Sequence, residues 1–351
     1  MDWIKELTPL VEARGISGDE QQVAQVIRQR LPQGWKAHSD ALGNLIVRYG
    51  CCAETPGGRR LLMVSAHMDE PGLLVTDIGE KGQVYFTVAG EIDEQVLAGR
   101  QVWIAGTHRE IPGVIGVKPI HILSAKERET PAKPDKLYVD IGCRSREEAL
   151  SLVRPGDAVT FEGGITPFGD GLIRGRALDS RSGCAIALML LQEDALRARM
   201  EKAGWELAVV FTAQRESGGA GMMTAAYALA PEISIVLESA PSAFHSAKNS
   251  PKLGLGPVLS LRDKASFYDR ELYRKAMTIA QGQGLPVQQK TAAFSSSDGV
   301  RAQLAGRGSR VLELSVPTRN PRTPCAIQSV KDLDVALQLL TALIQDQELA
   351  I

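Results

Sequence analysis

Apolar residues follow two spacings in the first 70 residues of the chain and again in the part from 164 to 351. In some segments they recur every three or four residues, which predicts amphipathic helices. In others they form short continuous runs, which predict strands buried on both faces. The expected strands are 44–49, 60–67, 206–212, 233–237 and 311–315, and the expected helices are 3–12, 183–200, 222–229, 268–281 and 330–345. Because strands and helices alternate, we expect an α/β fold with a mostly parallel sheet flanked by helices.

A further helix start is predicted at residues 17–20. Ser17 and Glu20 have the spacing of a capping box, in which each side chain bonds to the backbone of the other residue. The apolar positions that follow have helical spacing: Val23, Val26, Ile27 and Leu31. We therefore expect a helix directly after residue 20.

Between residues 71 and 163 the pattern changes to short apolar runs separated by Gly, Pro and charged residues. The expected strands are 73–76, 84–88, 101–104, 114–117, 136–141 and 158–161. A single clear helix, 146–153, interrupts them. Many short strands with turn signals predict a small β-barrel or sandwich inserted into the α/β fold. The chain is thus expected to divide into an α/β domain, formed by 1–70 and 164–351, and an inserted domain, 71–163.

Composition and charge exclude several classes of protein. A length of 351 residues favours two domains, and 44% hydrophobic with 23% charged residues is ordinary for a globular protein. The net charge of −1 argues against binding to nucleic acid or an anionic membrane. No apolar run approaches the ~18 residues of a membrane helix, and the N-terminus lacks the apolar segment of a signal peptide. The five cysteines are an odd number without zinc-finger spacing, so we expect reduced thiols in a cytoplasmic protein.

Acids and one histidine follow or end several of the expected strands, where ligands of parallel sheets gather. His67 and Asp69 are two residues apart, so on a strand they share a face, and the carboxylate can orient a metal-binding imidazole. Asp179 precedes the helix expected at 183, where a carboxylate also suits the helix dipole. Glu216 and Glu238 follow buried strands, where an unpaired carboxylate is costly, and each has a salt-bridged acid as its alternative. Four acids and a histidine around one edge favour a shared cation.

Longer segments of the chain match a known family: 66–70, 116–123, 139–142, 177–183, 297–299 and 317–319. Through them the chain resembles the tetrahedral or glutamyl-type aminopeptidases, which are exopeptidases with two co-catalytic metals and include members labelled endoglucanase. The resemblance implies a catalytic α/β domain of the zinc-exopeptidase type, interrupted by a β-barrel-like dimerisation domain. It also implies homo-oligomers built from dimers, up to dodecamers.

The resemblance also implies roles for single residues. His67 corresponds to a ligand of the first metal, with Asp69 behind it, and Asp179 corresponds to the acid that bridges both metals. Glu216 falls on a ligand of the second metal. Glu238 stands where the family usually has an aspartate on the first metal. The implied cofactor is a divalent ion, zinc or cobalt.

The pattern is broken at two positions. Arg215 stands at the place of the family's general base, and Arg322 stands at the place of a histidine on the second metal. A guanidinium stays protonated and has no acceptor, so Arg215 is not expected to act as a base. The last histidine in the chain is His245, which is either a substitute ligand or a solvent-facing loop residue.

Charge suggests how the two arginines fit the site. Asp179, Glu216 and Glu238 carry three negative charges, which two arginines reduce to one. We hypothesise that Arg215 and Arg322 occupy the place of the second metal and pair with Glu216 and Asp179. At most one divalent ion would then remain, at His67, Asp179 and Glu238.

Two functions follow from this interpretation. The first is a metallo-aminopeptidase-family protein whose dimetal site is degenerate and whose activity is weak or absent. The second is a non-catalytic protein that uses the same pocket for binding or assembly, with peptides or a small acidic ligand as partners. Asp298 matches a family acid near the substrate, where it would meet a peptide amine or else cap the next helix. A glycosidase role ranks last, because the acids are better explained as metal ligands.

Overall fold

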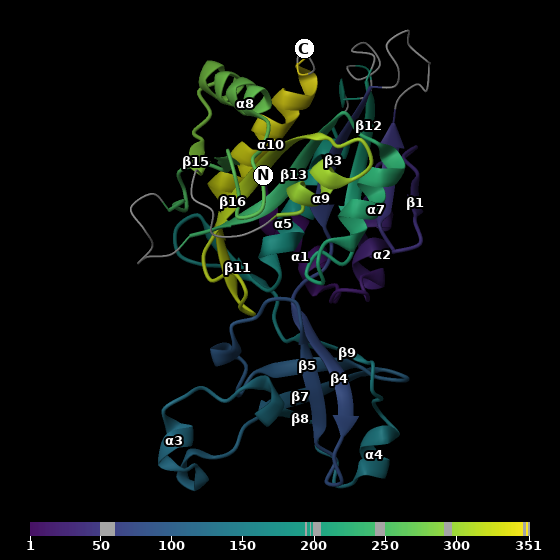
Figure 1. Cartoon of the computed structure of the whole chain (residues 1–351), viewed down its shortest axis with the longest axis vertical. Helices are drawn as coiled ribbons and strands as arrows, with labels where there is room; N and C mark the ends of the chain where they lie inside the picture. Colours follow the sequence, from purple (N-terminus) through teal and green to yellow (C-terminus); the bar gives the residue numbers. More distant parts are fainter. Residues whose placement is uncertain are drawn as a thin grey trace.

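The central element of the protein is an eight-stranded sheet (Figure 1). The computed structural model describes residues 1–49, 60–193, 195–196, 198, 205–242, 250–290, 297–346 and 349. The strands in sheet order are β1 (Ala37–Ser39), β2 (Leu45–Tyr49), β12 (Glu206–Thr212), β3 (Leu61–His67), β13 (Ile233–Pro241), β16 (Arg310–Thr318), β14 (Val258–Ser260) and β15 (Gln288–Lys290). The central strands β12, β3, β13 and β16 run parallel, so their carboxyl ends meet at one edge, as predicted.

Helices cover both faces of this sheet and create two apolar cores. The larger core includes residues of α1 (Trp3–Glu12), α2 (Gln21–Arg30), α5 (Leu178–Leu191), α8 (Arg270–Gly282) and α10 (Val330–Gln345). The smaller core includes residues of α7 (Ala220–Leu229) and α9 (Gly299–Leu304). On β3, Leu62 and Val64 enter the larger core, while Leu61 and Met63 enter the smaller one. Burial on both faces is why this strand is a continuous apolar run. None of the helices in the described ranges is long and apolar enough to cross a membrane.

The inserted segment forms a closed antiparallel barrel that projects from the α/β part (Figure 1). Its strands in barrel order are β4 (Gly72–Ile78), β5 (Val84–Ala89), β8 (Tyr138–Asp140), β7 (Glu110–Gly116), β6 (Gln101–Ala105) and β9 (Ala158–Phe161). Its connections carry α3 (Ala125–Arg128), α4 (Arg146–Leu150), η1 (Glu94–Val96), η2 (Ile120–Ile122) and η3 (Pro134–Lys136). Buried and exposed positions alternate along β7, so alternate side chains fill the barrel. A separate antiparallel sheet joins β10 (Ile165–Pro167), β11 (Leu172–Gly175) and β17 (Ala326–Ser329).

Among the elements whose bounds differ from their predictions, two carry predicted site residues. The helix expected from 183 begins at Leu178, directly after Ala177, which has the left-handed conformation with a φ of 53°. Asp179 is therefore inside the first turn of α5 instead of before it. Helix α5 ends at Leu191, and part of the remaining predicted span lies outside the described residues. Strand β13 continues to Pro241, so Glu238 lies within a strand and not after one.

The capping box predicted at residues 17–20 does not form. Helix α2 starts after Glu20 without a side-chain cap. The carboxylate of Glu20 accepts from the backbone N–H of Gly18 and of Gln214, both at 2.9 Å. The hydroxyl of Ser17 donates to Asp69 at 2.5 Å instead. The side chain of Ser17 therefore holds Asp69, and that of Glu20 holds the backbone at Gly18 and Gln214, and neither caps the helix.

Candidate functional site

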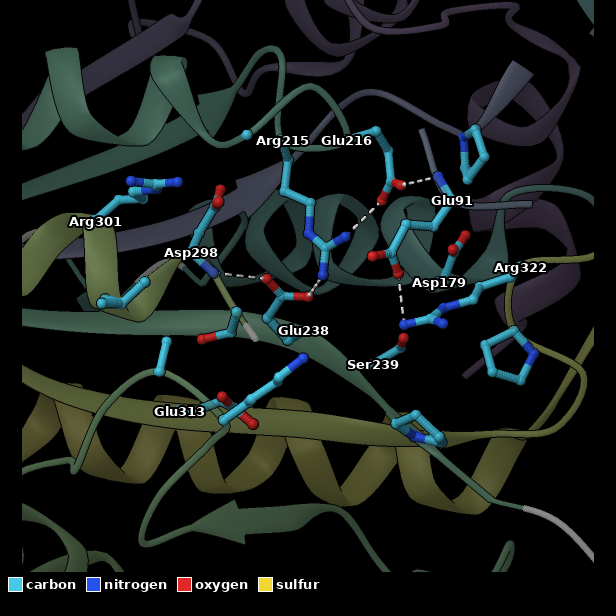
Figure 2. Close-up of a pocket in the computed structure, with 18 residues that line it drawn as sticks. Glu91, Asp179, Arg215, Glu216, Glu238, Ser239, Asp298, Arg301, Glu313 and Arg322 are labelled. Carbon is cyan, nitrogen blue, oxygen red and sulfur yellow. Dashed lines mark hydrogen bonds and ion pairs between the residues drawn. The ribbon is translucent and has the colours of Figure 1, made fainter. Parts of the chain in front are cut away.

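Six of the predicted site residues line one cavity of about 420 Å³ at the carboxyl edge of the sheet (Figure 2): Asp179, Arg215, Glu216, Glu238, Asp298 and Arg322. His67 and Asp69 lie beside it. His67 ends β3, and Glu238 lies on β13, the neighbouring parallel strand. Arg215 and Glu216 follow the end of β12. Asp179 comes from the first turn of α5. The position at the ends of parallel strands is thus the one that the sequence predicts.

Asp69 is fully buried and held by three donors. Its carboxylate accepts from the hydroxyl of Ser17 at 2.5 Å and from the backbone N–H groups of Arg215 at 3.0 Å and Glu216 at 2.8 Å. The Nδ1 atom of His67 lies 3.1 Å from the carbonyl oxygen of Asp69 and 3.5 Å from its carboxylate. Asp69 therefore fixes both the imidazole and the loop that carries Arg215.

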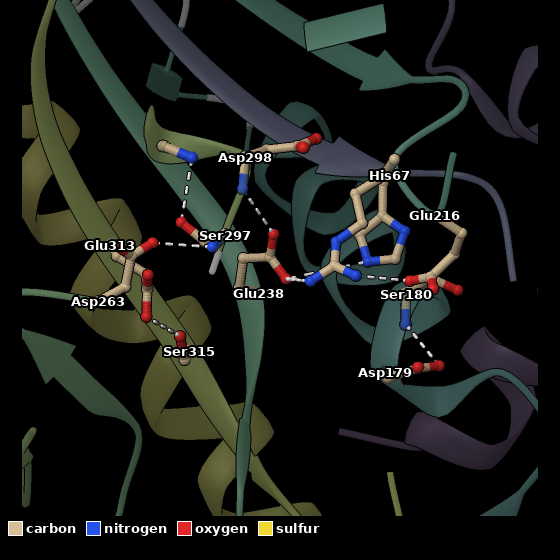
Figure 3. A network of polar contacts seen from close by, with 12 residues as sticks. His67, Asp179, Ser180, Glu216, Glu238, Asp263, Ser297, Asp298, Glu313 and Ser315 are labelled. Atoms are coloured by element: carbon tan, nitrogen blue, oxygen red, sulfur yellow. Dashed lines mark hydrogen bonds and ion pairs between the residues drawn. The ribbon is translucent and has the colours of Figure 1, made fainter. Parts of the chain in front are cut away.

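The guanidinium of Arg215 lies between the buried carboxylates of Glu216 and Glu238 (Figure 2), and Figure 3 shows the same two acids together with His67. Its Nη1 atom is 2.6 Å from Oε1 of Glu216, and its Nη2 atom is 3.7 Å from Oε2 of Glu238. The same oxygen of Glu238 is 3.9 Å from Nε2 of His67. The carboxylates are only 4% and 5% exposed, whereas the arginine side chain is 22% exposed. Arg215 is therefore the cation that balances these two acids.

Burial and charge shift the pKa values of the groups around Arg215. Glu238 above all, and then Glu216, raise the pKa of Arg215 against the opposing effect of burial, so it stays charged. Burial raises the pKa values of Asp179 and Glu216. For His67, burial works to lower the pKa, but the hydrogen bond to Asp69 and the charge of Glu238 raise it to about 9. The imidazole is therefore protonated at neutral pH, and it would have to lose that proton to bind a metal.

Arg322 does not reach the acids with which it was expected to pair. Its guanidinium binds the carboxylate of Glu91 at 2.5 Å, and the two side chains are 52% and 64% exposed. Its φ is 64°, and its carbonyl oxygen accepts from the backbone N–H of Asp93 at 3.1 Å. Because these contacts turn Arg322 toward the segment after β5, the expectation that both arginines pair with Glu216 and Asp179 is wrong for Arg322. Arg215 does pair with Glu216, as expected.

The segment after β5 is a part of the site that the sequence did not reveal. The backbone N–H of Glu91 donates to Oε2 of Glu216 at 3.2 Å. Gly90 has a φ of 93°, and a Cβ atom there would lie 2.9 Å from Cβ of Glu216. Only glycine allows this approach without strain. The only signal in the sequence was that residue 90 is a glycine, and a glycine in a loop is too common to indicate a site.

Asp298 lies at the start of α9 and faces the cavity. Its backbone N–H donates to Oε1 of Glu238 at 3.1 Å, and its side chain accepts from Thr212 at 3.3 Å. It makes no side-chain cap on α9. Burial and the charge of Glu238 raise the pKa of Asp298 to about 7. Of the two interpretations, facing a ligand is the one that this placement favours. His245 falls outside the described residues.

Two of the acids to which the resemblance gives a metal are paired with a side chain of the protein itself. The described ranges contain no group of three His, Cys, Asp or Glu side chains placed to hold a metal ion. Glu216 and Glu238, which the resemblance assigns to different metals, both pair with Arg215. The guanidinium of Arg215 therefore lies among the acids that the sequence predicts as metal ligands.

Comparison with known proteins decides the family. The model of the M42 glutamyl aminopeptidases matches residues 43–339, which is most of the chain. The chain belongs to the M42 glutamyl aminopeptidase family. The resemblance found in the sequence is confirmed by this match. M42 aminopeptidases generally depend on two metal ions, which supports a divalent metal as the cofactor of the family.

Individual relatives are similar to this M42 family member over nearly its whole length. The putative aminopeptidase FrvX of Escherichia coli (strain K12) is 33% identical over 345 residues, which cover 96% of this chain and 93% of FrvX. The TET1 peptidase of Pyrococcus horikoshii, which assembles into a tetrahedron or a large octahedral shell, has a TM-score of 0.86 at 29% identity over 97% of this chain and 98% of its own. A Thermotoga maritima protein named endoglucanase has a TM-score of 0.76 at 26% identity over 96% of each chain. The predicted fold is confirmed.

Proposed function

We propose that this protein is an M42 aminopeptidase-family member in which Arg215 substitutes for bound metal, so that its hydrolysis of N-terminal residues is weak or absent. The supporting observation is the pairing of the Arg215 guanidinium with Glu216 at 2.6 Å and Glu238 at 3.7 Å. A charged guanidinium has no lone pair with which to accept a proton from water. The position that the family uses for its general base thus holds a group without base function.

Under this proposal a chain binds at most one divalent ion, zinc or cobalt. Such an ion would be held by His67, Asp179 and Glu238, with Asp69 orienting His67. Arg215 would first have to move away from Glu238, because its positive charge would repel a metal ion bound to the same carboxylate. Arg322 supplies no ligand, and Glu216, the ligand assigned to the second metal, is paired with Arg215.

The second candidate function is binding without catalysis in the same cavity. It is favoured by the space that remains around the arginine, about 420 Å³, which is within the range of small-ligand sites. The cavity is lined by charged side chains from both the α/β part and the segment after β5. The ligand that membership of an aminopeptidase family suggests for this cavity is a peptide.

The chain is further proposed to assemble with copies of itself through the inserted domain, residues 71–163, with 1–70 and 164–351 forming the catalytic-type domain. The tetrahedral or octahedral assembly of the Pyrococcus horikoshii relative supports this. The thiols of Cys143, Cys184 and Cys325 are free, which supports a reducing, cytoplasmic setting.

Peptide hydrolysis by the purified protein tests the proposal. We expect release of N-terminal residues from a peptide mixture, with zinc or cobalt added, to be at least ~10²-fold slower than by a family member that keeps the glutamate base, since losing a general base costs about 10²–10⁴-fold. The matched control is the same protein with a chelator, which reports metal-independent background. A rate equal to that of the intact family member, and abolished by the chelator, would contradict the proposal.

A further inference from the structure

The most exposed apolar side chains of the α/β part lie on elements that also line the cavity. In the described ranges, four large apolar residues are at least 67% exposed: Ile120, Tyr227, Phe267 and Leu304. Ile120 lies in η2, on the inserted barrel. The other three lie on α7, on the loop before α8 and on α9, and we refer to these three as the apolar patch. Single exposed apolar residues are ordinary, but a group of them beside a cavity indicates a contact surface.

Helices α7 and α9 both begin at the cavity. Gly218, just before α7, and Val300 and Arg301 of α9 line it. The two helix starts are in contact, because a Cβ atom at Gly219 would lie 2.8 Å from Oδ1 of Asp298 and 3.0 Å from Cγ of Arg301. Both helices pack on the smaller core, and Figure 1 shows them side by side. Their surfaces therefore extend outward from the edge of the cavity.

Side chains on both helices lead from the cavity to the apolar patch. Val300 and Leu304 are four residues apart on α9 and so share a face. On α7 the same spacing joins Met223, which is also exposed, to Tyr227. A Cβ atom at Gly306 would lie 3.7 Å from Cδ2 of Tyr227, so the tyrosine ring lies beside the chain that follows α9. Tyr227 and Leu304 therefore belong to one surface.

The loop that carries Phe267 joins the cavity to the same surface. Lys264 and Ala265 line the cavity, and Phe267 follows two residues later. The carbonyl oxygen of Phe267 accepts from the side-chain amide of Gln303 at 2.8 Å, which ties the loop to α9. The guanidinium of Arg262 lies over the phenylalanine ring, 5.0 Å from its centroid. Each residue of the apolar patch is thus on a segment that also contributes to the cavity or directly follows its wall.

The size and position of the apolar patch favour a peptide over a second copy of the chain. Aromatic side chains bury 150–250 Å² each, so three residues at 67–71% exposure present roughly 400 Å². One partner of a standard protein–protein interface contributes about 800 Å². At about 1.5 Å per helical residue, Leu304 lies roughly 5 Å along α9 from Arg301, and Tyr227 roughly 12 Å along α7 from Gly219. An extended peptide covers that range in about two to four residues at ~3.3 Å each.

We propose that the apolar patch of Tyr227, Phe267 and Leu304 binds apolar side chains of a peptide whose N-terminal end lies in the cavity. The protein then selects extended peptides with apolar residues about two to four positions beyond the part held in the cavity. Shorter peptides, and peptides that are polar at those positions, bind more weakly because they leave the patch uncovered. The inference rests on the proposed function only in that the cavity holds the N-terminal end of a peptide; it does not require that the peptide be cleaved or spared.

Calorimetric titration of the full chain with matched peptides tests this. The apolar probe is Ala-Gly-Ser-Leu-Leu-Leu-Ser-Ser, and the polar probe has serine in place of the three leucines. A third probe is Ala-Gly-Ser alone, and a fourth carries the three leucines after six further serines. We expect the apolar probe to bind at least about 10-fold more tightly than each of the others, or about 1.4 kcal/mol. That is at the low end of what burial of one large apolar side chain supplies.

Variants of the patch show whether it carries this preference. The double variant Tyr227→Gln/Leu304→Gln should bind the apolar and polar probes equally. The control Ile120→Gln/Leu255→Gln, which removes two exposed apolar side chains outside the cavity, should keep the preference. Both variants should unfold at the temperature of the wild type, because all four side chains are more than half exposed.

Equal affinity of the wild type for the apolar and polar probes, or no binding of any probe, would overturn the inference. So would a preference that survives in Tyr227→Gln/Leu304→Gln, or one that persists when the leucines are moved along the peptide. A smaller assembly of that variant by light scattering would show that the patch is a contact between copies, and would also overturn it. If the wild type instead cleaves the peptides with metal, the same comparison is made with kcat/KM. An apolar preference that the double variant loses would then sustain this inference while refuting the proposed loss of activity.

Discussion

Replacing Arg215 with methionine is expected to lower the free energy of unfolding by about 3 kcal/mol, since removing one partner of a buried ion pair leaves the other charge uncompensated. The two acids that lose their cation, Glu216 and Glu238, are 4% and 5% exposed and cannot be solvated in place. Urea denaturation at pH 8 measures the loss. Arg322→Met is the matched control, and since its pair with Glu91 is exposed we expect a change of at most about 1 kcal/mol.

The loss caused by Arg215→Met is expected to shrink as the pH falls. Burial raises the pKa of Glu216, and Arg215 opposes that rise, so removing Arg215 raises the pKa further. A carboxyl group whose pKa is higher in the folded than in the unfolded state destabilises the fold above its folded-state pKa, and the penalty disappears as it becomes protonated. A loss that is equal at pH 5 and pH 8, or equal losses for the two arginine variants, would show that Arg215 does not compensate these acids.

The double substitution Arg215→Glu/Arg322→His is expected to raise metal-dependent peptide hydrolysis by at least ~10²-fold, the lower end of what a general base supplies. It removes the guanidinium that pairs with Glu216 and Glu238, and it puts back the base and the histidine that the family resemblance implies at these positions. Histidine tolerates the positive φ at position 322 better than most residues do. Initial rates on peptide substrates with zinc or cobalt measure the gain.

The control for that gain is Arg215→Gln/Arg322→Gln, which removes the same two charges without adding a base or a ligand. We expect it to stay at the wild-type rate. If both double variants gained equally, the arginines would act only as blocking groups. If neither gained, the two positions would not be what limits the activity of this chain.

The sheet and its edge could be predicted because they depend on local patterns. β3 and β12 are apolar at nearly every position, which only strands covered on both faces require. Their ends then place His67 and Arg215 at the same edge. The barrel could be predicted from its short strands, although the choice between barrel and sandwich needed the closure of β4 onto β9.

The rest of the site depends on contacts between distant segments, which no local pattern encodes. Arg322 pairs with Glu91 because the loop between β16 and β17 lies against the segment after β5, and no pattern in the sequence indicates that contact. Asp298 follows Ser297, whose backbone N–H donates to Asp263, a buried acid in the loop between β14 and α8, and the helix α9 after Asp298 is short. Ser17 has helix-cap spacing, but its hydroxyl donates to the buried carboxylate of Asp69, a charge-assisted bond, and makes no side-chain cap on α2.

Metal content per chain tests the central claim most directly. The purified protein is dialysed against excess zinc or cobalt, freed of unbound metal, and analysed by elemental mass spectrometry. If Arg215 substitutes for metal among Glu216, Glu238 and Asp179, we expect at most one ion per chain. Two ions per chain would contradict the account, because a chain that contains Arg215 would then still fill both metal positions.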